Sequence, residues 1–266
     1  DIPKDILNQV AAWVEPGNLD LPGYKPTTEP NPKMVLQASA LIKKSKKPIL
    51  YVGGGIIHSK ANNELFELAT KFNIPVVTTL MGRGAFPDGH ELCLEMPGMH
   101  GNYTATTSIQ NADLLIAIGV RFDDRVTANP SFFAQNAKVI HADIDPAEIG
   151  KVRDAQVPIV GDAKSVIKGL IDALGEEKLD TESWVSELKG MKTEFPLSYK
   201  QEDKGPLKVP YVLEELQKLT KEEAIVVAGV GQHQMWVSQH WNFTEPNTWL
   251  NSGGLGTMGY ALPAAI

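Results

Sequence analysis

The stretch Asp113-Leu-Leu-Ile-Ala-Ile-Gly-Val-Arg-Phe-Asp-Asp-Arg125 contains an unbroken apolar run that ends at Gly119. A run of this kind, without polar alternation, predicts a strand buried on both faces and therefore central in a parallel sheet. Two arginines and two aspartates follow at once, and ligands of open α/β sheets lie beyond the carboxyl ends of such strands. Arginine suits phosphate because its planar fork donates two parallel charge-assisted bonds. The alternative is a cluster of surface ion pairs on a loop.

Four other segments have the character of buried strands and complete a sheet around this run. They are residues 48–52, 74–80, 138–143 and 157–160. Helices are predicted over residues 32–44, 60–71, 103–110 and 163–174, with a short helix starting at Asp145-Pro146. Strand and helix thus alternate five times, which predicts a doubly wound parallel α/β domain. Each strand ends in a glycine, an acid or an arginine, so polar groups gather along one edge.

Composition divides the chain into residues 1–32, 33–174, 175–206 and 207–266. The first part, rich in proline and glycine, is predicted to be the end of a preceding domain and a linker. The second is the α/β domain, and the third is a polar linker. The fourth is predicted to begin another α/β unit. The elements expected in the last two parts are helices over 181–193 and 208–219 and a strand over 224–228.

Glycine-rich turns follow several of the predicted strands. Gly53-Gly54-Gly55 lies between a strand and a helix, which is the geometry that brings backbone N–H groups to a phosphate. It lacks the G-x-G-x-x-G spacing, so a plain turn is the alternative. The long loop over 82–101 is unusual for a compact domain unless it has a function. Gly229–Trp236 and Ser252–Gly259 each lead into a helix and together predict a diphosphate-binding site.

The composition argues against several classes of protein. The 266 residues carry a net charge of -7, which disfavours a general nucleic-acid binder. No apolar run approaches the roughly 18 residues that a membrane span needs. The single cysteine, Cys93, excludes an intrachain disulfide and a cysteine-based zinc site, and it is consistent with a cytoplasmic protein.

Five motifs, in order and spacing, resemble those of one family. They are Met96–Gly101, Gly119–Arg125, Asp143–Lys151, Gly231–Trp236 and Ser252–Gly259. Together they resemble the catalytic large subunits of the acetolactate synthases, within the thiamine diphosphate enzymes. The resemblance extends over essentially the whole chain. It departs from the family at Thr127-Ala-Asn-Pro130, where the family usually has Thr-Gly-Lys.

The resemblance implies a three-domain protein that uses thiamine diphosphate, Mg²⁺ and FAD. Asp1–Asp5 resembles the last strand of the first domain, which holds the glutamate that activates the cofactor. Residues 33–174 correspond to the FAD-binding middle domain, and residues 207–266 to the start of the diphosphate-binding domain. The family's catalytic glutamate and its magnesium motif both lie outside the 266 residues, so no catalytic or metal-binding residue is assigned here. We therefore expect these residues alone to be inactive.

Cofactor contacts are assigned by the same resemblance, residue by residue. The FAD contacts are Gly54, Thr79, Leu80, Gly98, Met99, His100, Gly119, Val120, Arg121, Phe122, Asp123, Asp124, Arg125, Asp143, Ile144, Gly161 and Asp162. The thiamine diphosphate contacts are Gln232, His233, Gly256, Thr257 and Met258. Met258 resembles the apolar residue that bends the cofactor, and His100 and His233 are candidates for moving protons or for positioning the cofactors.

The family's reaction decarboxylates pyruvate and joins the remaining two-carbon unit to a second 2-oxo acid, pyruvate or 2-oxobutyrate. This is a step in the biosynthesis of valine, leucine and isoleucine. The resemblance also implies a homodimer with a small regulatory subunit, and no nucleic-acid or membrane partner. The alternatives are a pyruvate oxidase-like enzyme, in which the flavin does redox work, and a non-catalytic dinucleotide-binding module.

Overall fold

The computed structural model describes residues 3–15, 17, 23–220 and 223–266. Its main unit is a five-stranded parallel sheet in the order β2-β1-β3-β4-β5. The strands are β1 (Pro48–Val52), β2 (Val76–Thr78), β3 (Leu114–Ile118), β4 (Lys138–Asp143) and β5 (Val157–Val160). β3 pairs with both β1 and β4, and all five of its residues are buried. The predicted central position of the apolar run is therefore confirmed.

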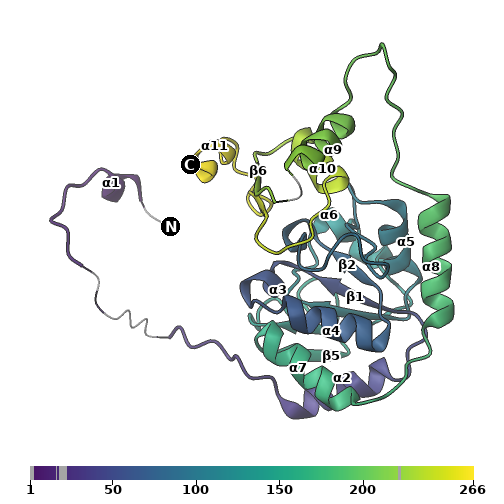
Figure 1. Cartoon of the computed structure of the whole chain (residues 1–266). Helices are drawn as coiled ribbons and strands as arrows, with labels where there is room; N and C mark the ends of the chain where they lie inside the picture. Colours follow the sequence, from purple (N-terminus) through teal and green to yellow (C-terminus); the bar gives the residue numbers. More distant parts are fainter. Residues whose placement is uncertain (1–2, 16, 18–22, 221–222) are drawn as a thin grey trace.

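Helices cover both faces of the sheet, as a doubly wound fold requires (Figure 1). One face packs against α2 (Pro32–Ile42), α4 (Asn62–Phe72) and α7 (Ala163–Leu174). The other packs against α5 (Tyr103–Asn111) and α8 (Glu182–Glu194). Alternate residues of β1 and β3 enter the two cores, because successive side chains point to opposite faces.

Side-chain caps fix where the helices begin. The Asn31 side chain accepts a hydrogen bond from Lys33 N at 2.9 Å, and Pro32 occupies the first turn of α2, as the Asn-Pro pair predicts. The Asp162 side chain caps α7. Short elements complete the unit: α3 (Gly54–His58), η1 (Leu80–Gly82), α6 (Asp124–Thr127) and η2 (Pro130–Phe132).

Three local predictions were wrong. The helix expected at Asp145-Pro146 is a run of turns, in which the Asp145 side chain accepts from Ala147 N and no helical repeat follows. Lys4 and Asp5, expected in a strand, begin the short helix α1 (Lys4–Leu7), while residues 1–2 lie outside the described part. The strand expected over 74–80 is limited to Val76–Thr78, because η1 begins at Leu80. Part of the linker predicted over 1–32 also lies outside the described residues.

A second, smaller unit follows α8. It contains α9 (Val209–Thr220), β6 (Val226–Ala228), α10 (Gln232–His240), β7 (Trp249–Asn251) and α11 (Ala261–Ala265). β6 and β7 form a two-stranded parallel sheet. Its core contains Val237, Trp241, Phe243 and Trp249. In the described part of the chain, no helix has the length and apolar character needed to cross a bilayer.

Candidate cofactor-binding cleft

The strand order creates a switch point between β1 and β3. The chain leaves β1 toward β2 on one side, and β3 lies on the other side, so the connections after these two strands diverge. Ligands of such sheets lie in the crevice that this divergence leaves at the carboxyl ends. Gly53–Gly55 follows β1 and Gly119–Arg125 follows β3, and the two turns meet through a hydrogen bond from Gly55 N to Gly119 O at 3.3 Å.

The two turns can approach this closely because they are made of glycine. Gly119 has φ +61°, and a Cβ added there would lie 2.6 Å from Gly55 Cα. A Cβ on Gly53 would lie 2.4 Å from Gly119 O. Gly54 differs, since an added Cβ would have only ordinary contact with Met81 at 3.5 Å. Gly53, Gly55 and Gly119 therefore close the floor of the crevice, and Gly54 faces its open side.

Two cavities lie along this crevice and share Gly54, Met81, Gly119 and Arg121. The larger, of about 570 Å³, extends along the ends of β4 and β5 to Asp143, Ile144, Gly161 and Asp162. The smaller, of about 120 Å³, extends along the ends of β1 and β2. It is lined by Tyr51, Thr79, Leu80, Val120, Asp123 and Arg125, among others. Together they form one cleft, which we call the switch-point cleft.

The structure places most of the predicted FAD contacts around this cleft, but not all. Phe122 is buried in the core, where its ring meets Tyr51 at 5.5 Å and His141 at 4.9 Å between centroids. Asp124 is exposed at the start of α6 and does not line either cavity. The turn Gly98–His100 lines neither cavity, although Met99 N donates to Arg125 O at 2.8 Å.

The acids of the cleft also hold the backbone in place. Asp162 accepts from Lys164 N at 3.0 Å and from Ser59 Oγ at 2.8 Å, which caps α7. Asp123 accepts from Arg125 N and pairs with Arg121, both at 3.0 Å. Burial raises the pKa of Asp143, and its carboxylate accepts from Asp145 N at 2.9 Å. The side chain of Arg121 is 59% exposed, so its guanidinium is accessible to a ligand.

The second unit contributes the far wall of the cleft. Gly253 lines the smaller cavity and Gly254 the larger. A Cβ on Gly253 would lie 2.5 Å from Met81 Sδ, so this glycine lets the turn after β7 approach η1. The Trp249 indole N–H also donates to Leu80 O at 3.1 Å. The turn that contains the predicted diphosphate contacts therefore begins at the wall of the switch-point cleft.

The predicted diphosphate contacts lie on two turns of this unit. Gln232 and His233 are the first residues of α10, and the His233 ring lies beside the Gly229–Gly231 turn. Gly256 has φ +65°, and Thr257 N donates to Ser252 Oγ at 2.9 Å. Met258 is 81% exposed. The first N–H groups of α10 have no partner within the helix, which is the usual arrangement for binding an anion.

Comparison with known proteins agrees with this architecture. The model of the central domain of thiamine pyrophosphate enzymes matches residues 35–170, more than half of the chain. The model of the C-terminal TPP binding domain matches residues 229–266. The chain belongs to the thiamine pyrophosphate enzymes.

Relatives of this thiamine pyrophosphate enzyme match it along its whole length. It is 53% identical over 269 residues to the acetolactate synthase large subunit of Corynebacterium glutamicum, covering 100% of this chain and 43% of the relative. It is 46% identical over 274 residues to acetolactate synthase 2, chloroplastic, of Nicotiana tabacum, covering 40% of that protein. The acetolactate synthase large subunit of Buchnera aphidicola is 43% identical, with 47% covered. The chain thus spans less than half the length of these relatives.

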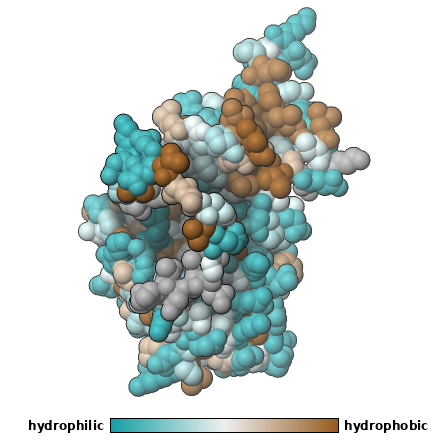
Figure 2. Space-filling model, turned by 90° about the vertical axis from the view of Figure 1, so that its left-hand side faces the viewer, coloured by the Kyte–Doolittle hydropathy of each residue, from teal (hydrophilic) through white to brown (hydrophobic). Residues whose placement is uncertain are grey.

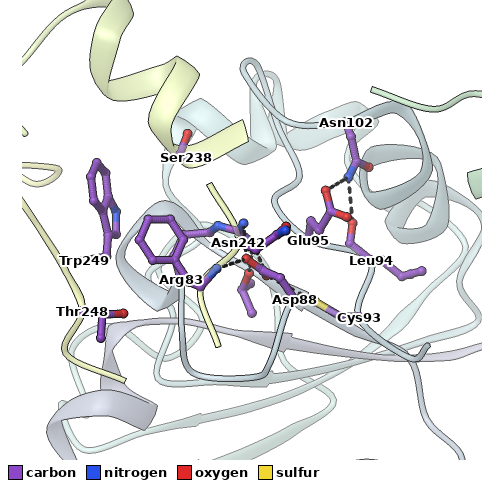
Figure 3. Close-up of polar contacts among 12 residues, drawn as sticks. Arg83, Asp88, Cys93, Leu94, Glu95, Asn102, Ser238, Asn242, Thr248 and Trp249 are labelled. Atoms are coloured by element: carbon purple, nitrogen blue, oxygen red, sulfur yellow. Dashed lines mark hydrogen bonds and ion pairs between the residues drawn. The ribbon is translucent and has the colours of Figure 1, made fainter. Parts of the chain in front are cut away.

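A buried ion pair in the first unit of this thiamine pyrophosphate enzyme contacts the second unit (Figure 3). Arg83 and Asp88 make two hydrogen bonds of 2.6 and 2.7 Å, and their side chains are 2% and 1% exposed. Phe243 N of the second unit donates to the same carboxylate at 2.7 Å, and the Phe243 ring lies 5.5 Å from the guanidinium carbon. Burial raises the pKa of Asp88, and Arg83 opposes that rise. We call these three residues the interunit clamp.

Sequence reasoning missed several residues that the structure brings to these places. Tyr51, His58 and Met81 line the cleft, yet their sequence contexts are those of a buried strand, a short helix and a loop. Arg83 and Asp88 lie in a glycine-rich loop without periodicity, so nothing in the sequence indicated that they are buried and paired. Only the loop's length suggested that it had a function.

Proposed function

We propose that this chain is part of the large subunit of an acetolactate synthase. The observation on which this rests is the switch-point cleft, bounded on one side by the sheet edge and on the other by the turn of the diphosphate-binding unit. The identity to acetolactate synthases over the whole chain supports the proposal. The chain spans 43% of its bacterial relative, so the activity belongs to the longer protein.

We propose FAD as the ligand of the switch-point cleft. Arg121 lies where the two cavities meet, and Arg125 lines the smaller one, so both would bind the diphosphate through charge-assisted bonds. Asp143, at the end of β4, would accept hydrogen bonds from ribose hydroxyl groups, as acids at such strand ends do. The smaller cavity, beside Thr79 and Leu80, would hold the flat ring system.

The turns at Gly231–His233 and Gly256–Met258 would bind the diphosphate of thiamine diphosphate, with Mg²⁺. When bound, this cofactor would supply a nucleophilic carbon and an electron sink for the decarboxylation of a 2-oxo acid. The chain's own residues would bind and orient it: backbone N–H groups at the start of α10 would meet the diphosphate, and His233 lies beside that turn. Met258 would support the bent shape of the cofactor.

The proposed reaction joins the two-carbon unit from pyruvate to pyruvate or 2-oxobutyrate, for branched-chain amino-acid biosynthesis. We further propose a homodimer with a small regulatory subunit. Figure 2 shows apolar side chains gathered over the upper part of the molecule, where the second unit lies. Leu207, Leu219, Ile225, Leu255 and Leu262 are all exposed. An apolar surface of this kind supports coverage by more protein.

FAD binding to the 266-residue chain tests the first part of this proposal. We expect quenching of flavin fluorescence with saturable binding, and Arg121→Ala should weaken binding about tenfold or more, the value of a charge-assisted bond. Lys138→Ala is the matched control, because this exposed residue is the first of β4 and lies at the amino end of the strand, away from the cleft at the carboxyl ends. Equal binding by both variants would contradict the assignment.

Product analysis tests the reaction. The longer protein, with thiamine diphosphate, Mg²⁺ and FAD, should form acetolactate from pyruvate while the flavin stays oxidised. The 266 residues alone should form none, because the family's activating glutamate and magnesium ligands are not among them. Flavin reduction by pyruvate would instead favour a pyruvate oxidase-like enzyme. Nucleotide binding without any product from the longer protein would favour a non-catalytic module.

A further inference from the structure

Tyr51 is a fully buried residue of β1 whose hydroxyl has no hydrogen-bond partner among the described residues. A buried tyrosine hydroxyl usually finds a partner, because burial removes its bonds to water. The ring itself is well packed, with Phe122 edge-on at 5.5 Å between centroids. Phenylalanine would make the same ring contacts, so the packing of the core does not account for the hydroxyl.

Tyr51 is also one of the residues that line the switch-point cleft. Tyr51 lines the smaller cavity, together with Thr79, Leu80 and Arg121. The charged groups that act on the phenol are Asp123 and Arg121, both at the rim of that cavity. Burial raises the pKa of Tyr51, so the phenol stays protonated and keeps its donor near neutral pH.

Arg121 and Asp123, which line the same cavity as Tyr51, are joined by a weak contact. Arg121 and Asp123 pair at 3.0 Å, with side chains 59% and 38% exposed. Exposed pairs of this kind contribute little to stability. A ligand that binds Arg121 through its phosphates can therefore separate the pair and approach the phenol.

We propose that the Tyr51 hydroxyl is a further binding group of the switch-point cleft and donates a hydrogen bond to the ring system of a flavin. A flavin ring offers carbonyl oxygens and ring nitrogens as acceptors, and Tyr51 lines the 120 Å³ cavity. This inference rests on the proposed FAD site and adds a residue that binds the ring rather than the phosphates.

The test compares wild type with Tyr51→Phe in the 266-residue chain. FAD affinity, measured by flavin fluorescence, should fall about fivefold to tenfold, the range expected for one neutral hydrogen bond. ADP lacks the flavin ring, so its affinity should be the same for both proteins. The thermal midpoint of the ligand-free variant should equal or exceed that of wild type, because an unpaired buried hydroxyl is removed.

Tyr199→Phe is the matched control, because its hydroxyl bonds to Glu214 at 2.7 Å outside the cleft, and FAD affinity should not change. Unchanged FAD affinity in Tyr51→Phe would overturn the inference while leaving the FAD site intact. An equal loss for FAD and ADP would also overturn it, since the effect would then not come from the ring. Failure of the wild-type chain to bind FAD would overturn both proposals.

Discussion

At the scale of single residues, the floor of the cleft depends on a backbone contact that tolerates no side chain. Gly119 has φ +61°, a conformation that favours glycine, and its Cα lies against Gly55. The sequence predicted a turn here from the glycine alone. It could not predict the contact partner, because Gly55 is distant in the chain and only the pairing of β1 with β3 brings the two together.

Gly119→Ala should therefore destabilise the chain strongly. The added Cβ would lie 2.6 Å from Gly55 Cα and would also strain the backbone. Each effect costs about 1–3 kcal/mol, so the free energy of unfolding should fall by about 2–6 kcal/mol. Urea denaturation measures this. Gly190→Ala is the control, since nothing lies within 4 Å of its added Cβ and it lies in α8, where alanine is favoured over glycine. A loss below about 1 kcal/mol in Gly119→Ala would contradict the contact.

His141 should make stability depend on pH. It is fully buried in β4, its Nε2 lies 2.9 Å from Val120 O, and burial lowers its pKa from 6.5. Below about pH 6.5 the unfolded chain therefore binds a proton that the folded chain does not. The contribution of His141 to stability is fully present above about pH 6.5 and is lost as the pH falls below it. His141→Gln keeps a donor for Val120 O and cannot titrate. Denaturation of wild type and variant from pH 8 to 5 measures this. The difference between their free energies of unfolding should change below about pH 6.5. A constant difference would show that His141 does not cause the pH dependence of stability.

At the scale of elements, the ends of helices show what sequence can and cannot predict. The Asn31-Pro32 start of α2 was predicted because both residues act locally. Asp145-Pro146 has a similar local signal, yet it forms a run of turns, in which the Asp145 side chain accepts from Ala147 N. Helix α3 was missed because two glycines begin it, and its position depends on the contact of Gly55 with Gly119. Local signals therefore predicted most helices and strands, and the ones they missed depend on tertiary contacts.

The end of α6 contains a strained residue that offers another test. Ala128 has φ 49° and ψ -108°, and it stands where the acetolactate synthase pattern has glycine. Ala128→Gly should relieve strain of about 1–3 kcal/mol, partly offset by the entropy that glycine adds to the unfolded chain. We expect a net gain of about 1 kcal/mol in the free energy of unfolding. Ala40→Gly, in the exposed interior of α2, should instead lose about 1 kcal/mol. Equal losses in both variants would show that Ala128 is not strained.

At the scale of the whole molecule, the sequence predicted two α/β units but not how they meet. The strand pattern of the first unit was confirmed because each buried strand is a continuous apolar run. The contact between the units depends on a loop of irregular structure, where no periodicity separates buried from exposed residues. The same loop lines the cleft at Thr79–Met81 and holds the second unit at Asp88, so it links the two proposed cofactor sites.

Arg83 and Asp88 of the interunit clamp should contribute to stability as a pair rather than individually. Removing one partner of a buried ion pair leaves an uncompensated charge and costs about 3–5 kcal/mol, whereas replacing both with apolar residues is often nearly neutral. Arg83→Met and Asp88→Leu should each destabilise the chain by about that amount. The double variant should be more stable than either single variant, despite the lost bond from Phe243 N. Lys71→Ala is the control, because its partner Glu176 is exposed and such pairs contribute about 0–1 kcal/mol. Additive losses in the double variant, measured by urea denaturation, would show that Arg83 and Asp88 act independently.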